Sequence, residues 1–390
     1  MSTDNGTPKR WRRRRTTIVV SAATAGALVF VGAPLTALAL TGTFSSHGVP
    51  VANTPQAAYA PSWSSHSAGT KAVLTAIAKS AGADPSYYAY LAASGGSEIV
   101  QVDVSAGAIV GEIGADTANG VAVSPDGSTV YIAETGQYYV IADNLVTKTE
   151  TQIEVGPYPM DVAVSPTGKV VYAAVTGGDT GPGGSDKVAV IDPATNKVTG
   201  DITVGTAPRQ VVFSPDGSAA YVTTETGIYE IDTATSKVVR VIGDPAGPQG
   251  IAVSPDGSTL YVTNNDAGTL LKIDAASGKI TSSVAAGAEP EAVAVTPDGS
   301  TVYVADMNSD SVSVIDAATL KVTGTISVGR LPMSVTVSPD GSQVWVGNGY
   351  SGSVSIIATA TNSVLATVGG GPGTSTLDAA ITGIAFAPAP

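Results

Sequence analysis

The chain of 390 residues contains no cysteine, and its only histidines are His47 and His66. The first absence excludes disulfide bonds, thiolate metal ligands and a cysteine nucleophile, so packing must stabilise the fold. The second means that any catalysis beyond residue 66 must proceed without histidine. Acids, amides and hydroxyls remain as the chemical groups from which a site could be built.

Aromatic residues are few, at 5%, and long apolar runs are missing beyond the N-terminal region. The 43% hydrophobic content is still enough for a large core, which excludes a disordered chain. With 45 glycines and 24 prolines, this composition favours many short strands joined by tight turns. We therefore expect an all-β protein.

The N-terminus has the pattern of an export signal. Six basic residues lie within residues 9–15, and residues 16–41 carry no charge. Ala37-Leu38-Ala39 offers a small-x-small cleavage site, so we expect residues 1–40 to be a signal peptide and the protein to be secreted or at the cell surface. The alternative is an uncleaved signal anchor, because the uncharged stretch of residues 16–41 is longer than the roughly 20 residues that a bilayer core needs.

The export route is left open by the sequence. Arg14 and Arg15 resemble a twin-arginine signal, but Thr17 stands where that signal usually has Phe. Both the twin-arginine and the general secretory route therefore fit.

The chain is strongly acidic once this segment is set aside. Of the 19 basic and 32 acidic residues, 13 and 31 follow residue 15, which gives a net charge near −18. No cluster of Lys or Arg with interleaved aromatics counters that field locally. We expect no nucleic-acid partner, and contact with a membrane only through an uncleaved N-terminal segment.

Two segments connect the signal to the main domain. Residues 41–69 are rich in Ser, Ala and Pro and are typical of a linker. Within residues 70–86, Val73, Leu74 and Ile77 share one helical face, which predicts a short helix and lead-in.

A repeat of about 40 residues fills the rest of the chain. Its marker is a [Ser/Thr]-Pro-[Asp/Thr]-Gly turn that begins at Ser124, Ser165, Ser214, Ser254, Thr296 and Ser338. Between these turns, segments such as TVYIAE at 129 show the two-residue alternation of strands. A period near 40 with four strands in each unit predicts a β-propeller.

A second recurring turn starts at an aspartate in most units. The positions are Asp103, Asp143, Asp192, Asp232, Asp274 and Asp316. Repeated carboxylates could suggest calcium, but an aspartate that caps its own turn explains the spacing, and we favour that interpretation.

The strand count predicts seven blades within residues 87–390. Six complete units begin near residues 121, 162, 211, 251, 293 and 335. Three strands precede them, at 87, 98 and 109, and one follows at Ile384 to Pro388. The N-terminal strands and the C-terminal strand would together form the seventh blade, which closes the ring and removes exposed strand edges.

Tyr261-Val262-Thr263-Asn264, with KVTGTISVG at Lys321 to Gly329, resembles the YVTN (YncE-like) family of β-propeller repeats. The resemblance covers residues 87–388 and implies a seven-bladed propeller of an exported bacterial protein. It implies little about activity, because propellers of this kind include surface proteins, binding modules and some enzymes.

Ligands of propellers usually bind at the mouth of the central funnel, which the segments leading into the innermost strands would line. One equivalent residue from each segment is expected there: Asn119, Met160, Arg209, Gln249, Glu291, Met333 and Thr382. Arg209 and Glu291 are the only charged members, and we expect that they can pair across the channel. Tyr138, Tyr158 and Tyr350 are predicted on loops of the same face, as flat rings suited to sugars or peptides.

These residues favour a ligand-binding or protein-interaction scaffold, with a cell-wall glycan, a peptide or a surface protein as partner. The alternative is a secreted hydrolase or lyase that works without histidine. Calcium could assist it through oxygen ligands such as Asn119 and Glu291, although a calcium cage usually needs more carboxylates. We predict no other cofactor and assign no catalytic or metal-ligating residue.

Asp306 to Asp310 begins like a calcium loop but lacks the final Glu, so a hairpin tip is favoured.

Overall fold

The computed structural model describes residues 87–94, 98–104, 108–177, 186–243, 247–369 and 380–388. All of them belong to one compact unit, Ala60–Pro390. No helix in this part of the chain is long and apolar enough to cross a membrane. The predicted signal, linker and short helix lie outside the described residues, so they stay predictions.

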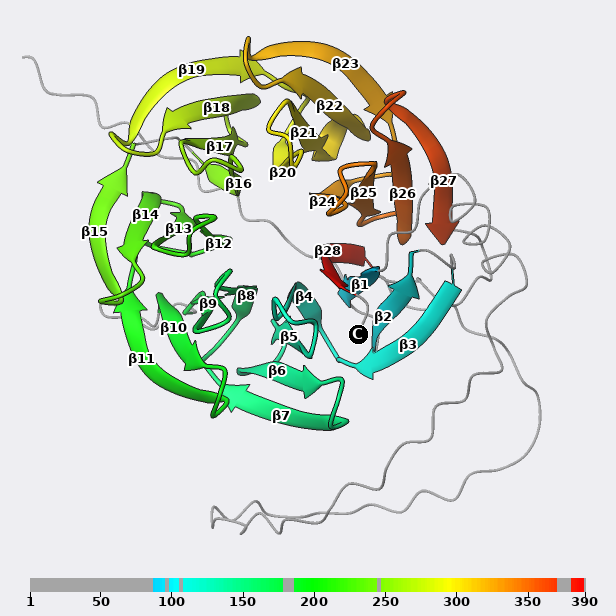
Figure 1. Ribbon diagram of the computed structural model, residues 1–390. Helices are drawn as coiled ribbons and strands as arrows, with labels where there is room; N and C mark the ends of the chain where they lie inside the picture. The colour runs from blue at the N-terminus through cyan, green and yellow to red at the C-terminus, as the bar shows by residue number, and fades with distance from the viewer. Residues whose placement is uncertain are drawn as a thin grey trace, which may run out of the picture. The chain divides into compact units, whose positions relative to one another are not determined.

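The described strands form seven antiparallel sheets of four strands, arranged around a centre as blades (Figure 1). The chain is therefore a seven-bladed β-propeller, as its repeats predict. From the inside outward the sheets are β28 (Ala380–Pro388), β1 (Tyr87–Ser94), β2 (Glu98–Asp103) and β3 (Ala108–Gly114); β4 (Ala118–Val123), β5 (Thr129–Glu134), β6 (Tyr139–Asn144) and β7 (Thr149–Glu154); β8 (Pro159–Val164), β9 (Val171–Val175), β10 (Lys187–Asp192) and β11 (Lys197–Thr203); β12 (Val211–Phe213), β13 (Ala219–Thr224), β14 (Gly227–Asp232) and β15 (Lys237–Ile242); β16 (Pro248–Val253), β17 (Thr259–Asn264), β18 (Thr269–Asp274) and β19 (Lys279–Ala285); β20 (Pro290–Val295), β21 (Thr301–Asp306), β22 (Ser311–Asp316) and β23 (Lys321–Ser327); and β24 (Pro332–Val337), β25 (Gln343–Asn348), β26 (Ser353–Ala358) and β27 (Ser363–Gly369).

The ring closes through the predicted pairing of the two ends of the domain. Strand β28 runs antiparallel to β1, with Tyr87 opposite Pro388 and Ser94 opposite Ala380. The closing strand is longer than predicted, because it begins at Ala380 and not at Ile384. Its extra residues reach the mouth of the central channel.

The tyrosine of the YVTN-like strand fills the space between neighbouring blades. Tyr131, Tyr172 and Tyr303 are at most 1% exposed. At the equivalent position of β25, Trp345 packs edge-on to Phe386 of the next blade, with ring centroids 5.6 Å apart. The Tyr303 hydroxyl also donates to Asn362 Oδ1, 2.7 Å away in the adjacent blade. The strand recurs because every blade must present one large side chain to its neighbour.

The last residue of the same strand holds the loop that leads into its own blade. Glu134 Oε2 accepts hydrogen bonds from the backbone N–H groups of Asp116 and Thr117, at 3.1 and 2.9 Å. Asp306 Oδ1 accepts one from the N–H of Gly287 at 2.9 Å. These carboxylates satisfy backbone donors that the sheet leaves unpaired.

The two recurring turns are structural, as expected. Asp126 Oδ1 accepts from the Ser128 N–H at 3.0 Å, and Gly127 has a φ of 72°, which a residue with a Cβ would adopt only with strain. Asp192 Oδ1 accepts from the Ala194 N–H at 3.0 Å in the second turn. These aspartates cap their own turns.

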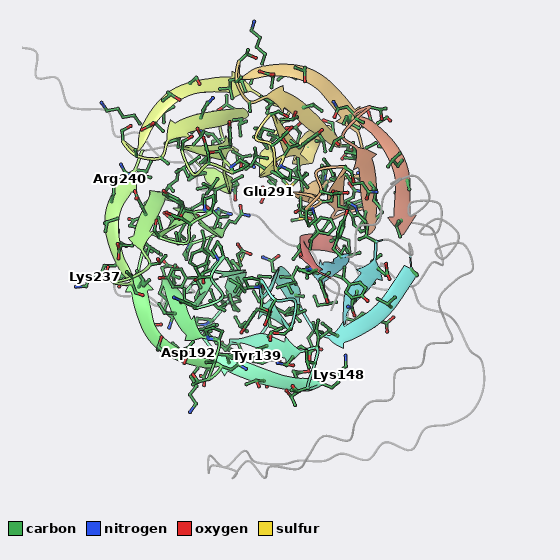
Figure 2. All side chains as sticks on the ribbon, in the orientation of Figure 1. Tyr139, Lys148, Asp192, Lys237, Arg240 and Glu291 are labelled. Atoms are coloured by element: carbon green, nitrogen blue, oxygen red, sulfur yellow. The ribbon has the colours of Figure 1, made fainter. Side chains whose placement is uncertain are left out.

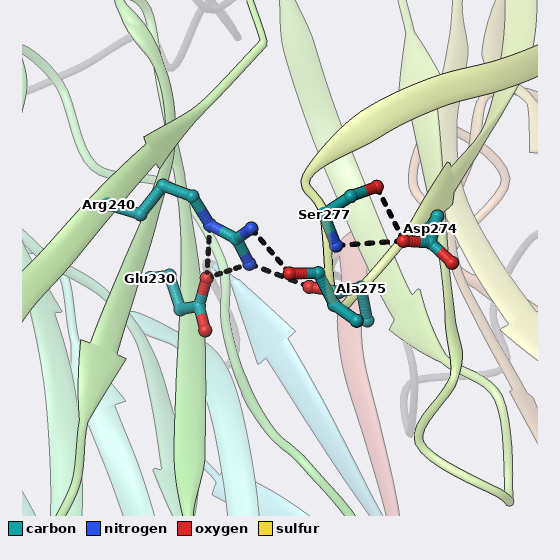
Figure 3. Close-up of polar contacts among 6 residues, drawn as sticks. Glu230, Arg240, Asp274, Ala275 and Ser277 are labelled. Atoms are coloured by element: carbon teal, nitrogen blue, oxygen red, sulfur yellow. Dashed lines mark hydrogen bonds and ion pairs between the residues drawn. The ribbon is translucent and has the colours of Figure 1, made fainter.

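Arg240 joins two blades at the outer part of the ring (Figure 3). It forms an ion pair with Glu230 of its own blade. It also donates to the backbone oxygens of Ala275 and Ala276 in the next blade, at 2.6 and 2.8 Å. Lys272 repeats this contact one blade further on, by donating to the Ala317 oxygen at 2.8 Å. Contacts of this kind fix neighbouring blades and thereby the geometry of the channel.

Candidate functional site at the mouth of the channel

Six of the seven inner strands have a β-bulge near their start, which turns side chains into the channel. In blade β20–β23, Pro290 lies opposite Asp306 but Ala292 lies opposite Ala305, so Glu291 is an extra residue without a cross-strand partner. A bulge of this kind re-aims its residue out of the sheet. The same irregularity places Met160, Met333 and Thr382.

The seven residues predicted at the funnel mouth line a single cavity of about 410 Å³. They are Asn119, Met160, Arg209, Gln249, Glu291, Met333 and Thr382. Figure 2 shows Glu291 at the inner end of its blade, beside the central opening. A volume of this size suits a small molecule or the end of a chain. The geometric part of the prediction, that these positions converge, agrees with the structure.

A second layer of residues also lines the cavity and is missed by the sequence analysis. The seven residues above form a first layer, and Asp161, Gln210 and Ser334 each directly follow one of them in the sequence. In an undisturbed strand, successive side chains point to opposite faces, so these positions would be expected to face away from the channel. The bulges of β8 and β24 bring both layers into the cavity, whereas Arg209 and Gln210 lie directly before β12. The sequence offers one signal for this second layer, which is that an additional residue recurs directly before the regular alternation of the inner strands begins.

Two members of this second layer tie neighbouring blades together. Asp161 Oδ2 accepts a hydrogen bond from the Val211 N–H at 3.0 Å. Gln210 Oε1 accepts one from the Ile251 N–H at 2.8 Å. The side-chain oxygens therefore satisfy backbone donors of the next inner strand. Ser334 differs, since its buried hydroxyl forms no hydrogen bond within the described residues.

Glycines allow the inner strands to approach closely at this level. A Cβ on Gly250 would lie 2.7 Å from the Glu291 backbone oxygen and 2.8 Å from the Ala292 Cα. A Cβ on Gly383 would lie 2.7 Å from the Asn119 backbone oxygen. The narrow part of the channel is thus lined by backbone as well as by side chains.

Burial changes the acidity of both cavity carboxylates. It raises the pKa of Asp161 to about 7, although hydrogen bonds from the Val211 and Val162 N–H groups act in the opposite direction. Burial also raises the pKa of Glu291, and the positive charge of Arg209 partly offsets that rise. An acid with a pKa near 7 can hold or release a proton at physiological pH.

The expected pairing of Arg209 with Glu291 is wrong in its geometry. Arg209 Nη2 lies 3.7 Å from Glu225 Oε1, on the hairpin of its own blade. Glu291 Oε2 instead accepts a long hydrogen bond of 3.4 Å from Asn265 Nδ2. The two charges face one cavity without direct contact, because each side chain finds a nearer partner on an adjacent loop.

The three tyrosines lie on loops around the cavity and outside its wall. Tyr138, Tyr158 and Tyr350 are 59%, 50% and 66% exposed. The Arg330 guanidinium lies over the Tyr350 ring, 4.1 Å from its centroid.

No three His, Cys, Asp or Glu side chains gather to hold a metal ion in the parts of the chain that the structure describes. Asn119, one of the two suggested calcium ligands, donates from Nδ2 to the Met160 backbone oxygen at 2.8 Å. Asp306 is engaged with backbone and serine donors, and the 3-10 turn η1 (Met307–Ser309) follows it as a hairpin tip. The calcium prediction therefore has no assembled ligand set behind it and stays a hypothesis.

Family comparisons agree with this architecture. The family described as "Lactonase, 7-bladed beta-propeller" matches residues 184–316 and 281–369, and the SMP-30/gluconolactonase/LRE-like region matches residues 85–226. No curated protein matches the chain. The chain is similar to propellers of the lactonase type. Each of the two families matches less than half of this chain, so neither match shows that the chain belongs to that family.

Solved structures share the fold with this chain. A hydrazine synthase of Kuenenia stuttgartiensis is 23% identical, with a TM-score of 0.61 over 68% of this chain and 90% of that one. A functionally unknown protein of Desulfotomaculum acetoxidans is 15% identical, with a TM-score of 0.65 over 77% and 98%. A chain of a mitotic checkpoint complex is 16% identical, with a TM-score of 0.59 over 70% and 81%. At such identities the likeness concerns the fold alone.

Proposed function

We propose that this protein is an exported propeller of the YVTN (YncE-like) kind that binds a ligand at the mouth of its channel, and so acts as a binding or interaction scaffold at the cell surface or outside the cell. One observation carries the proposal. One residue from each of the seven blades lines a single cavity, and the exposed tyrosines Tyr138, Tyr158 and Tyr350 lie on or against loops that lead into inner strands. Mixed polar, apolar and aromatic surfaces of this kind are typical of recognition sites.

The channel lining does not have the arrangement of a nucleophile held by a base. In the described residues, Asp161 is hydrogen-bonded to backbone, and Glu291 contacts an amide. Neither contacts a hydroxyl that it could activate. Binding without turnover is therefore the function that the lining supports best.

A histidine-independent hydrolase or lyase is the second candidate. The partial matches to lactonase and gluconolactonase-like families favour it, and Glu291 and Asp161 are the acids that it would use. Calcium could assist such a reaction only if a ligand or water completed the coordination.

One experiment separates the two candidates. The purified protein is incubated with cell-wall glycans, peptides and a set of lactones and esters, with calcium and with a chelator. We expect saturable retention of at least one glycan or peptide and no turnover of the esters or lactones. Turnover that is abolished in Glu291→Ala, but kept in the outer-strand variant Glu154→Ala, would refute the binding function.

A further inference from the structure

The blade order arranges the mouth of the cavity symmetrically around Gln249. The inner strands β8, β12, β16, β20 and β24 are consecutive neighbours in the ring (Figure 1). Their first-layer residues are, in the same order, Met160, Arg209, Gln249, Glu291 and Met333. A cation and an anion therefore flank one amide, and a thioether side chain lies beyond each charge.

The central three residues of this arc have hydrogen-bonding capacity to spare. Among the described residues, Arg209 has only its 3.7 Å ion pair, and Glu291 accepts only one bond of 3.4 Å. The side-chain amide of Gln249 forms no hydrogen bond within that part of the chain, whereas its backbone oxygen accepts from Thr223 Oγ1 at 2.8 Å. The side chains of Arg209 and Glu225 are 37% and 57% exposed, so their 3.7 Å contact is weak and leaves the Arg209 guanidinium open to a ligand.

The opposite side of the mouth is already satisfied. Asn119 Nδ2 donates to the Met160 oxygen at 2.8 Å, and Thr382 Oγ1 donates to the Ala118 oxygen at 3.2 Å. The donor groups of these two side chains hold neighbouring blades together. Apart from the Ser334 hydroxyl on β24, the groups that are available to a ligand are thus concentrated on three adjacent blades.

A ligand with one charge fits this arc poorly. An anion placed at Arg209 leaves Glu291 without an ionic partner and adds repulsion, and a cation placed at Glu291 leaves Arg209 with only its 3.7 Å contact to Glu225. A molecule that carries both charges offers a partner to Arg209 and to Glu291 at the same time. The cavity of about 410 Å³ limits that molecule to a small one.

We propose, on the basis of the binding function above, that the cavity takes a small zwitterion of the amino-acid or dipeptide type. Its carboxylate lies at Arg209, its ammonium group lies at Glu291, and Gln249 hydrogen-bonds the atoms between them. The thioether side chains of Met160 and Met333 form flexible apolar walls for the side chain of the ligand.

Calorimetric titration of the full-length protein tests this inference with leucine and glycyl-leucine as zwitterionic probes. The analogues N-acetyl-leucine, leucine amide and N-acetyl-leucine amide carry only the negative charge, only the positive charge and neither charge. We expect at least one zwitterion to bind, and its singly charged analogues to bind at least about tenfold more weakly, which equals about 1.4 kcal/mol for each lost contact.

Matched variants locate the contacts on the protein. Arg209→Gln and Glu291→Gln should each weaken binding of the zwitterion at least about tenfold. Lys237→Gln, on the outer rim in Figure 2, and Glu154→Gln, on β7, remove the same charges elsewhere and should leave affinity unchanged. The analogue series on the unaltered protein reports on the same two charges if a variant fails to fold.

The outcomes separate this inference from the binding function on which it rests. Equal binding of zwitterionic, singly charged and neutral probes would overturn the inference, and so would the absence of binding by both zwitterions. In either case retention of a glycan or peptide in the first experiment would still support the scaffold. Failure of that retention experiment refutes the scaffold separately.

Discussion

At the scale of single residues, the channel contains a carboxyl group whose surroundings oppose its charge. Asp161 is enclosed by the inner strands of adjacent blades, and burial raises its pKa from 3.8 to about 7. At pH values between these two pKa values, the folded protein therefore keeps a proton on Asp161 that the unfolded chain has already released. Because the folded state binds more protons in that window, stability falls as pH rises from about 4 to about 7.

Asp161→Asn should remove this dependence. The amide keeps an acceptor for the Val211 N–H and carries no charge, so we expect the variant to be more stable than the parent at pH 8, by up to about 4 kcal/mol. Near pH 4 the two proteins should differ little. Denaturant unfolding of both across pH 4 to 8 measures the difference, and a gap that does not widen with pH contradicts the assigned burial effect.

At the scale of strands, the bulged start of six of the seven inner strands builds most of the site. The bulge requires the backbone of one blade to lie against the backbone of the next, which Gly250 permits beside Glu291 and Ala292. The same close approach aims Glu291 at the cavity. Packing between strands and the position of a site residue are therefore a single structural feature.

Gly250→Ala should disturb both. The new Cβ would lie 2.7 Å from a backbone oxygen that cannot move aside alone, so we expect a loss of about 1 to 3 kcal/mol in the free energy of unfolding. Gly324→Ala is the matched control, since a Cβ there meets nothing within 4 Å. The control should change stability by less than about 0.5 kcal/mol. Equal losses in both variants would contradict the close-approach argument.

At the scale of the whole propeller, stability depends on joining the two ends of the domain. Strand β28 supplies Ile381, which is fully buried, and Phe386, which contacts both Tyr87 and Trp345. It thus completes the first blade and also packs against the last one. No local segment can replace it, because its partners lie almost 300 residues earlier in the sequence.

Deletion of residues 380–390 should open the ring. The inner edge of β1 and the flank of the last blade would lose their cover, which exposes unpaired backbone groups and apolar side chains. We expect the melting temperature to fall by about 10 °C or more, with aggregation, since several kcal/mol of packing are lost. Thermal unfolding and gel filtration measure this, with a chain shortened only by residues 389 and 390 as control. An unchanged, cooperative transition would show that closure does not stabilise the ring.

The fold and part of the site could be predicted from the sequence, because the patterns that specify them lie within short segments of the chain. Turns such as Ser124 to Gly127 need particular residues at fixed positions, so their repetition reveals the blades. Because the strands have nearly constant lengths, equivalent residues can be aligned by counting, which is how Asn119 and Glu291 were placed at one mouth. Their role in binding stays a prediction.

Other features were decided only by the tertiary structure. The bulge that brings in Asp161 depends on pairing across strands, and the pairing of Arg209 with Glu225 depends on which loops meet at the mouth. The raised pKa of Asp161 comes from the burial that neighbouring blades impose. A sequence encodes turns and alternation through neighbouring residues, whereas burial, register and charge pairing arise between segments that meet only when the ring has closed.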